Sequence, residues 1–275
     1  MSKNESPNLR ESKRESVSFE TIVYEKQNGV ATITLNRPQA LNAFNPQMNS
    51  EFMDALKEAD EDKNIRCFLI TGSGRAFCAG QDLKARTREQ RGSLGESLRD
   101  RYNPIVLRLR RTEKIVLAAV NGVAAGAGCN LALACDLRIA SEEARFIEAF
   151  VRVGLAPDSG GSFFLPRLVG LSKAMELFLL GEPVEAQESL RIGLVAKVVP
   201  ARELPTAARE MAERLARGPR SIGLIKRAVN RSLLSELENQ LEYEAYLQDL
   251  AGRSADYDEG VRAFLEKRSP VFTGR

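Results

Sequence analysis

Asp158 lies in the sequence GLAPDSGGS (residues 154–162), where it is the one carboxylate among residues that shape the main chain. The chain has no histidine, so the side chain that most often transfers protons near neutral pH is absent. Two interpretations of Asp158 stay open. It carries a proton during a reaction, or it caps a helix, because Asp before Ser-Gly-Gly-Ser and an apolar run is typical of a helix start. Ser159 and Ser162 do not indicate a hydrolase, since the usual triad that activates a serine needs histidine.

Two glycine-rich turns each follow a predicted strand, AFCAGQDLK at residues 76–84 and NGVAAGAGCN at residues 121–130. Small residues let a ligand approach the main chain, and unpaired N–H groups at the start of a helix favour negative charge. The two turns together could direct one N–H each at a single oxygen. In such an oxyanion hole one donor lowers a reaction barrier by roughly 2.7–4 kcal/mol. The alternative is that both are ordinary tight turns. The second turn lacks the GxGxxG spacing of a dinucleotide-binding loop and the GKS or GKT of a phosphate loop.

Composition excludes several classes of protein. The 275 residues are 43% hydrophobic, enough for one large domain or a domain with an appendage. The 40 basic and 37 acidic residues are nearly balanced and form no basic stripe, so we expect no nucleic-acid partner. No apolar run is long enough to span a membrane, and residues 1–17 lack the apolar core of a secretory signal. We expect a cytoplasmic protein whose residues 1–17 are a disordered tail.

Cysteine spacing argues against a metal centre. Cys67, Cys78, Cys129 and Cys135 form no CxxC pair, and no histidine is present to complete a zinc site. We therefore expect no bound metal and four reduced thiols, most of them buried.

Hydrophobic patterns predict an α/β protein. Residues 19–25 and 30–35 indicate two strands joined by a turn at Asn28-Gly29, and Asn45-Pro46 indicates the start of an amphipathic helix that runs to about Asp60. Further strands are predicted near residues 65–71, 115–120, 137–140, 145–147 and 195–199, with a helix over residues 129–134. Beyond residue 172 the chain is predicted to be mainly helical. Residues 206–275 are too amphipathic to stand alone and should pack on the core or on a neighbouring subunit.

Four ordered motifs carry a resemblance to a known family: NRPQALNAF (36–44), GRAFCAGQDLK (74–84), AAVNGVAAGAGCNLALACDLRIAS (118–141) and GLAPDSGGSFFLPRLVG (154–170). With these motifs the chain resembles the enoyl-CoA hydratase/isomerase, or crotonase, family, and is most similar to its phenylacetate-pathway branch of ring-1,2-epoxyphenylacetyl-CoA isomerases. The resemblance implies a spiral of ββα turns over residues 18–204 and a C-terminal helical region, residues 205–275, that mediates trimers or dimers of trimers. It also implies an acyl-CoA thioester as substrate and no cofactor beyond the CoA of that substrate.

The resemblance also assigns candidate site residues. The two oxyanion donors of the family fall on the main-chain N–H groups of Gln81 and Ala127. The residues expected to contact the CoA ester are Ala40, Ala79, Gln81, Asp82, Leu83, Lys84, Asn130 and Phe150, with Lys84 as a phosphate partner and Asp82 as a cap of its turn. Phe264, Lys267 and Arg268 resemble a segment that reaches CoA from an adjacent subunit; a packed aromatic with solvated charges is the alternative.

One departure from the family decides the expected chemistry. The two glutamates with which its hydratases activate water correspond to Asn130 and Phe150, and neither of these can carry a proton. Asp158 corresponds to the aspartate of the isomerase branch, so we expect an isomerase in which Asp158 shuttles the proton. If residues 148–150 form a strand, Glu148 shares a face with Phe150 and is a second candidate base. The alternatives are an enoyl-CoA hydratase and a non-catalytic acyl-CoA-binding protein.

Overall fold

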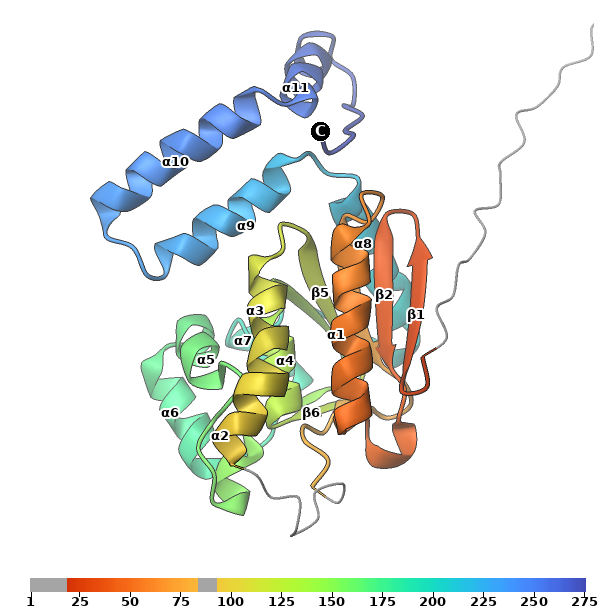
Figure 1. Ribbon diagram of the computed structural model, residues 1–275, viewed down its shortest axis with the longest axis vertical. Coiled ribbons are helices and arrows are strands. Elements are labelled where there is room, and N and C mark those ends of the chain that lie inside the picture. Colours follow the sequence, from red (N-terminus) through yellow and green to blue (C-terminus); the bar gives the residue numbers. More distant parts are fainter. Residues whose placement is uncertain (1–18, 84–92) are drawn as a thin grey trace, which may run out of the picture.

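A six-stranded sheet forms the centre of the molecule in the computed structural model, which describes residues 19–83 and 93–275 (Figure 1). Its strand order is β1-β2-β3-β5-β7-β10. The strands are β1 (Ile22–Gln27), β2 (Val30–Leu35), β3 (Cys67–Gly72), β5 (Ile115–Val120), β7 (Leu137–Ser141) and β10 (Lys197–Val199). β1 and β2 pair antiparallel through the predicted turn, where Asn28 and Gly29 have positive φ, and the other pairs are parallel.

Four short strands form a second sheet. Three of them directly follow a strand of the first sheet along the chain. The second sheet contains β4 (Ala76–Cys78), β6 (Val123–Ala125), β8 (Arg145–Ile147) and β9 (Val184–Glu185). β3 leads to β4, β5 to β6 and β7 to β8, and each pair of strands is followed by helix. This repetition is the expected spiral of ββα turns. β4, β6 and β9 were not predicted, because two or three residues carry no readable periodicity. The sequence analysis placed the residues of β4 and β6 in the two glycine-rich turns.

Helices surround the two sheets. They are α1 (Pro46–Glu61), α2 (Leu94–Ser97), a π-helical turn (Leu98–Tyr102), α3 (Asn103–Arg111), α4 (Ala127–Ala134), α5 (Gly161–Val169), α6 (Leu171–Leu180), α7 (Ala186–Arg191), α8 (Leu204–Ala216), α9 (Ser221–Ser232), α10 (Leu237–Gly252) and α11 (Ala255–Leu265), with 3-10 turns η1 (Pro38–Ala40), η4 (Ala149–Val153) and η5 (Ala201–Glu203). α1 begins where the sequence predicts, since the Asn45 side chain accepts a hydrogen bond from the Met48 N–H at 2.8 Å. Its predicted apolar face is buried.

The central sheet is covered on both faces. One hydrophobic cluster, with Phe52, Phe68 and Phe146, fills the space between the sheet, α1 and the second sheet. Another lies between the opposite face and α8, whose Ala208 and Ala212 are buried there. All six residues of β5 are therefore buried, which explains its continuous apolar sequence.

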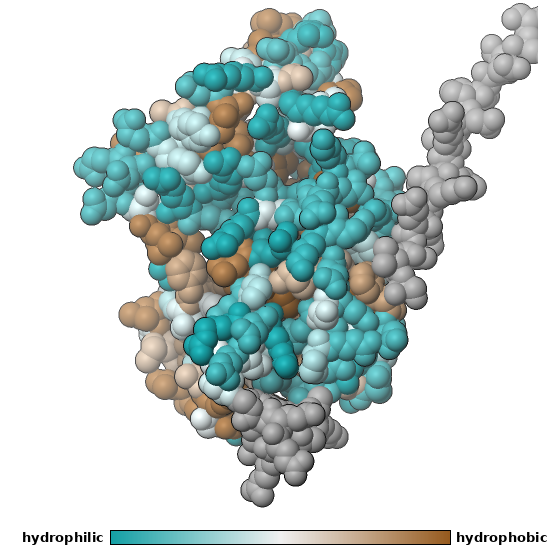
Figure 2. All heavy atoms as spheres, viewed as in Figure 1, coloured by the Kyte–Doolittle hydropathy of each residue, from teal (hydrophilic) through white to brown (hydrophobic). Residues whose placement is uncertain are grey.

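α9 and α10 form an arm that leaves this body, with α11 beyond it (Figure 1). Several of its large hydrophobic residues are exposed, among them Ile225, Val229, Leu241 and Phe264. Hydrophobic atoms also gather at the edge of the molecule where α6 lies, and Leu171 and Leu179 on α6 are largely exposed (Figure 2). Within the described ranges, no helix combines the length and the apolar character needed to cross a membrane.

A buried ion pair ties α9 to the central sheet. Lys226, whose side chain is 2% exposed, contacts Asp136 at 2.7 Å and donates to the main-chain oxygens of Leu109 and Lys114. Asp136 in turn accepts from the Val116 N–H of β5 at 2.8 Å. Burial lowers the pKa of Lys226, and the charge of Asp136 opposes that change.

We expect Asp136→Asn to lower the free energy of unfolding by about 3 kcal/mol, because it leaves the buried ammonium of Lys226 without its counter-charge. Urea unfolding of the purified chain measures this. Asp54→Asn is the matched control: Asp54 forms an exposed ion pair with Lys57, so its loss should cost less than about 1 kcal/mol. Equal effects of the two variants would contradict the expectation.

Candidate active site

The two glycine-rich turns lie side by side. β4 and β6 are parallel neighbours in the second sheet, so the turns that follow them meet at the same edge. Gly80 has a φ of +91°, and a side-chain carbon added there would lie 2.8 Å from the Ala125 oxygen and 3.3 Å from the Ala127 nitrogen. Only glycine allows this contact between the two main chains. The structure thus brings together the segments that carry Gln81 and Ala127.

Neither predicted donor has a main-chain acceptor among the residues that the structure describes. Phe44 donates to the Gly80 oxygen at 2.7 Å and accepts from the Asp82 N–H at 2.9 Å, which leaves the intervening Gln81 N–H without an acceptor in the described part of the chain. Ala127 is the first residue of α4, where an N–H has no partner within the helix. The positive end of the α4 dipole adds to its affinity for negative charge. This pair can hold a developing oxyanion.

The segment 37–44 lies against the first turn. Ala40 ends η1, and the Leu41 oxygen that follows it accepts from the Ala79 N–H at 2.9 Å. Arg37 and Asp82 form an ion pair at 2.9 Å, so Asp82 helps to join the two segments. Leu83 is 58% exposed at the end of the turn. Lys84, the expected phosphate partner, lies outside the described residues.

Asp158 is not a helix cap, so that interpretation is wrong. Ser159 and Gly160 have positive φ, and the turn they make delays α5 until Gly161, with Gly160 as its N-cap. The Asp158 carboxylate instead accepts from the Ser159 hydroxyl at 2.8 Å, while its main-chain oxygen accepts from the Gly161 N–H. The carboxylate is therefore not committed to a helix N-terminus. Burial raises its pKa, and the Ser159 bond opposes the rise only in part.

Asn130 and Phe150 border this site in different ways. Asn130 on α4 is fully buried, and its amide Nδ2 donates to the Asp158 main-chain oxygen at 2.9 Å. Phe150 is buried in η4, and a side-chain carbon added at Gly126 would lie 3.8 Å from its ring. Asn130 thus holds the loop of Asp158, and Phe150 lies over the residue before Ala127.

Glu148 does not share a strand face with Phe150. β8 ends at Ile147 and η4 begins at Ala149, so the expected alternation of a strand does not continue through these positions. Glu148 is only 3% exposed, and burial raises its pKa to about 7. Sequence analysis identified it as a candidate base but could not show its isolation from water.

A small apolar cavity joins the two halves of the site. It has a volume of about 10 Å³ and is lined by Phe44, Tyr102, Ile105, Val106, Ala127, Leu131 and Ser159. It therefore includes one predicted donor and the serine whose hydroxyl binds Asp158. The Asp158 charge contributes to a rise in the pKa of Tyr102, whose first cause is burial. At this volume the cavity has room for about one water molecule, so it marks where these residues meet and is not a space that holds a substrate.

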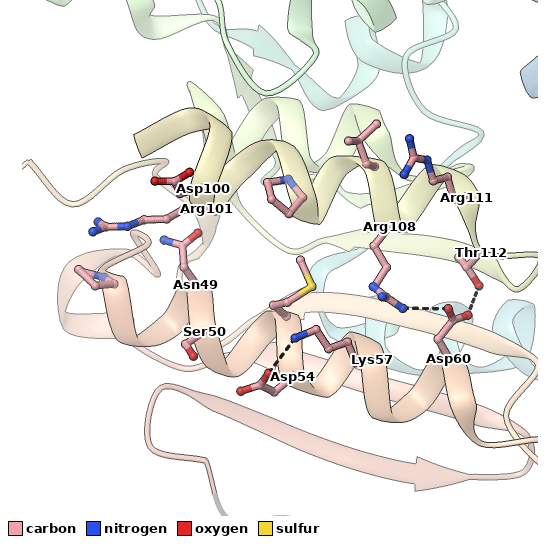
Figure 3. A pocket seen from close by; sticks show the side chains of 14 residues that line it. Asn49, Ser50, Asp54, Lys57, Asp60, Asp100, Arg101, Arg108, Arg111 and Thr112 are labelled. Atoms are coloured by element: carbon pink, nitrogen blue, oxygen red, sulfur yellow. Dashed lines mark hydrogen bonds and ion pairs between the residues drawn. The ribbon is translucent and has the colours of Figure 1, made fainter. Parts of the chain in front are cut away.

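A larger cavity of about 780 Å³ lies elsewhere, between α1 and α3 (Figure 3). Its lining is mostly charged or polar and includes the Arg108–Asp60 ion pair at 3.1 Å. None of the predicted site residues that the structure describes lines it. This cavity could not be predicted from the sequence, because most of its lining consists of ordinary polar residues of α1, the π-helical turn and α3.

The sulfur and acidic groups form no metal centre in residues 19–83 and 93–275, where no three His, Cys, Asp or Glu side chains gather in a suitable arrangement. All four cysteines are buried and unpaired, as expected.

Comparisons with known proteins agree with these motifs. A sequence model of the family described as "Enoyl-CoA hydratase/isomerase" matches residues 25–275. The chain is 48% identical over 261 residues to the 1,2-epoxyphenylacetyl-CoA isomerase of Escherichia coli K12, covering 94% of this chain and 100% of that protein. It is 46% identical to a Rhodobacter capsulatus protein named "probable enoyl-CoA hydratase", with the same coverage. The crystal structure of an enoyl-CoA hydratase from Bacillus anthracis superposes with a TM-score of 0.86 at 34% identity, covering 93% of this chain and 100% of that one.

Proposed function

The chain belongs to the enoyl-CoA hydratase/isomerase family, and from this premise we propose that it is an acyl-CoA isomerase in which Asp158 moves the proton. The observation that carries the proposal is the arrangement around Asp158. Its carboxylate is half-buried, is released from the helix N-terminus, and is joined through Ser159 to a cavity that Ala127 also lines.

The reaction follows from the two kinds of group. The N–H groups of Gln81 and Ala127 bind the thioester oxygen of a 3-enoyl-CoA, which makes the protons on C2 more acidic. The Asp158 carboxylate removes one of these protons. The electron pair of the broken C2–H bond is then shared between the thioester oxygen, C2 and C4 in a dienolate, whose oxygen remains hydrogen-bonded to the two N–H groups. Protonated Asp158 then returns the proton to C4, and the product is the 2-enoyl isomer. One acid is enough, because the proton that leaves is the proton that returns.

A raised pKa suits Asp158 to this task. An exposed aspartate is a weak base for a carbon acid, because its conjugate acid gives up its proton too readily. Burial of Asp158 raises its pKa and so brings its proton affinity closer to that of the bound enolate.

The substrate has two candidate acyl groups. A linear 3-enoyl group uses the dienolate directly. A ring 1,2-epoxide of phenylacetyl-CoA opens to an oxepin when the ring bond between its two epoxide carbons breaks. Transfer of a side-chain C2 proton to a ring carbon, through the enolate of this ester, then gives the conjugated isomer. The name of the E. coli relative supports this second substrate. In both cases Ala40, Ala79, Asp82, Leu83 and Lys84 would contact the CoA portion, and Phe150 the acyl portion.

Water addition is the second candidate function, favoured by relatives named as hydratases. Against it, Asn130 and Phe150 occupy the positions from which a hydratase of this family activates water, and neither side chain can carry a proton. A hydratase here would need Glu148 or Asp158 in their place. The same two substitutions would also suit a non-catalytic acyl-CoA-binding protein.

We also propose that the chain works as a homotrimer or a dimer of trimers in the cytoplasm. Apolar residues are exposed on α6 and on the arm, and Phe264 is 83% exposed. These surfaces support contacts with other copies of the chain, which would cover them. The exposure of Phe264 also argues against a packed aromatic within one chain. Four unpaired thiols support a reducing compartment. Light scattering of the purified chain would show the number of subunits.

An activity panel tests the proposed function. Linear 3-enoyl-CoA, 2-enoyl-CoA and ring-epoxide CoA esters are incubated with the enzyme in D2O, and the products are followed by NMR. We expect isomerisation of a 3-enoyl or ring-epoxide ester, with deuterium at C2 or C4. Water addition as the fastest reaction would favour the hydratase. Tight binding of the esters without turnover of any of them would favour the binding protein.

A further inference from the structure

Glu148 is a buried carboxyl group that lies between β8 and η4. Neither of its side-chain oxygens has a hydrogen-bond partner of ordinary geometry among the described residues. An ionised carboxylate in such a place is strongly unfavourable. The group must be neutral, or something must compensate its charge.

A second unpartnered atom belongs to a side chain that interacts with Glu148. Asn130 is fully buried, and its Oδ1 has no partner among the described residues. Its orientation is fixed, because Nδ2 donates to the Asp158 main-chain oxygen at 2.9 Å, and a flipped amide would face that oxygen with another acceptor. Asn130 therefore has a free acceptor, Oδ1, and lies close enough to Glu148 to influence the Glu148 pKa.

One proton satisfies both residues. Ionised Glu148 and Asn130 Oδ1 are two acceptors, which cannot bond to each other. If Glu148 is a carboxylic acid, its O–H can donate to Asn130 Oδ1. The other polar neighbour, Cys129, stays a thiol, since burial and the Glu148 carboxyl raise its pKa, and it can donate weakly to the remaining oxygen.

The neighbours of Glu148 act on its pKa in both directions. Burial, the first cause, and the negative charge of Asp158 from the loop before α5 raise the pKa, whereas Cys129 and Asn130 of α4 lower it, and the net result is a pKa of about 7. Arg152 of η4 lies beside Gly181, which is close to the Glu148 main-chain oxygen rather than to its carboxyl group. No neighbouring cation in the described ranges contributes to the Glu148 pKa.

We propose that Glu148 is a positioning residue of the isomerase. It remains a neutral acid while Asp158 is ionised, and its O–H donates to Asn130, which fixes the amide that binds the main chain of Asp158. Glu148 touches neither the substrate nor the moving proton. The inference rests on the proposed function, and it replaces the interpretation of Glu148 as a second base.

The pH dependence of turnover follows with a definite sign. When the pH rises through the Glu148 pKa of about 7, the proton leaves to solvent, the bond to Asn130 is lost and a second negative charge arises near Asp158. Turnover should therefore fall on the alkaline side. On the acid side it should fall when Asp158 itself becomes protonated.

The test compares kcat and KM of wild type and Glu148→Gln from pH 5.5 to pH 8.5. The substituted glutamine side chain is neutral at every pH, and its NH2 group can donate to Asn130 Oδ1. We expect the variant to match wild-type kcat within about threefold at pH 6, and to lack the fall of about tenfold per pH unit that wild type shows well above pH 7. Glu143→Gln, the same change on an exposed turn, should leave the profile unchanged.

Two kinetic results would overturn the inference. If Glu148→Gln loses a hundredfold or more at every pH, Glu148 carries the transferred proton itself. If the variant keeps the alkaline fall, the titrating group lies elsewhere.

Infrared spectroscopy of the wild-type enzyme provides a measurement that needs neither the variant nor activity. A band of a protonated carboxyl should be present at pH 6, where exposed carboxyls are ionised, and should disappear with a midpoint near pH 7. Its absence at pH 6 would refute the inference. Failure of every CoA ester to react would refute the proposed function and leave this band to decide on Glu148.

Discussion

Asp158→Asn is expected to lower kcat for isomerisation by a hundredfold or more, with a change in KM below about threefold. The amide has the shape of the carboxylate but cannot accept the C2 proton. The loop should keep its place, because the Gly161 N–H and the Asn130 amide both bind the main-chain oxygen of residue 158, which the substitution leaves intact. Stopped-flow or coupled assays of the purified variant give both constants.

Deuterium exchange and a control variant make this test decisive. The variant should also lose exchange at C2 of the bound ester, since enolate formation needs the base. Asp249→Asn makes the same change on an exposed face of α10 and should keep wild-type turnover. Unchanged turnover or undiminished C2 exchange in Asp158→Asn would remove Asp158 from the mechanism.

Gly80→Ala is expected to lower kcat/KM by about a hundredfold to a thousandfold, comparable to the loss of one oxyanion donor. The added carbon would lie 2.8 Å from the Ala125 oxygen and 3.3 Å from the Ala127 nitrogen, and both belong to main chain that must move away. The φ of +91° adds backbone strain. The turns that carry Gln81 and Ala127 would separate, so that one carbonyl oxygen could no longer reach both N–H groups.

A control variant separates the effect of backbone strain at Gly80 from the effect of the close contact with the second turn. Gly193 also has a positive φ, +77°, but a carbon added there meets only the Leu168 oxygen, at an ordinary 3.8 Å. Gly193→Ala should therefore lose some thermal stability while its activity at low temperature stays near that of wild type. If Gly80→Ala folds, remains stable and keeps its activity, the two turns do not form the oxyanion hole.

Several local features of the fold could be predicted because each depends on a stretch that is continuous in sequence. The hairpin at Asn28-Gly29 and the cap of α1 at Asn45 follow from local preferences that need no tertiary contact, and the structure has both. The family resemblance rests on four uninterrupted stretches, and the ββα spiral confirms the fold that it implies. Gln81 and Ala127 were selected in the same way, each as a main-chain donor in its own turn.

Other features depend on contacts between distant segments and could not be predicted. The choice between cap and free carboxylate at Asp158 depends on a turn with positive φ at Ser159, a conformation that few residues other than glycine adopt. β6 exists because β4 and β8 pair with it on either side, and its own residues carry no strand signal.

The amino-acid order alone established which groups are present: a chain without histidine, two glycine-rich turns, and Asp158 as the one carboxylate of residues 154–162. These depend on covalent identity and local preference. Only the tertiary structure shows the hydrogen bond from the Asn130 amide to the Asp158 main-chain oxygen, and only it supports the proposed neutral state of Glu148. Both depend on burial and on which residues, distant in sequence, lie together away from water. Hydrogen-bond partners and desolvation are properties of the folded neighbourhood, and no spacing along the chain encodes them.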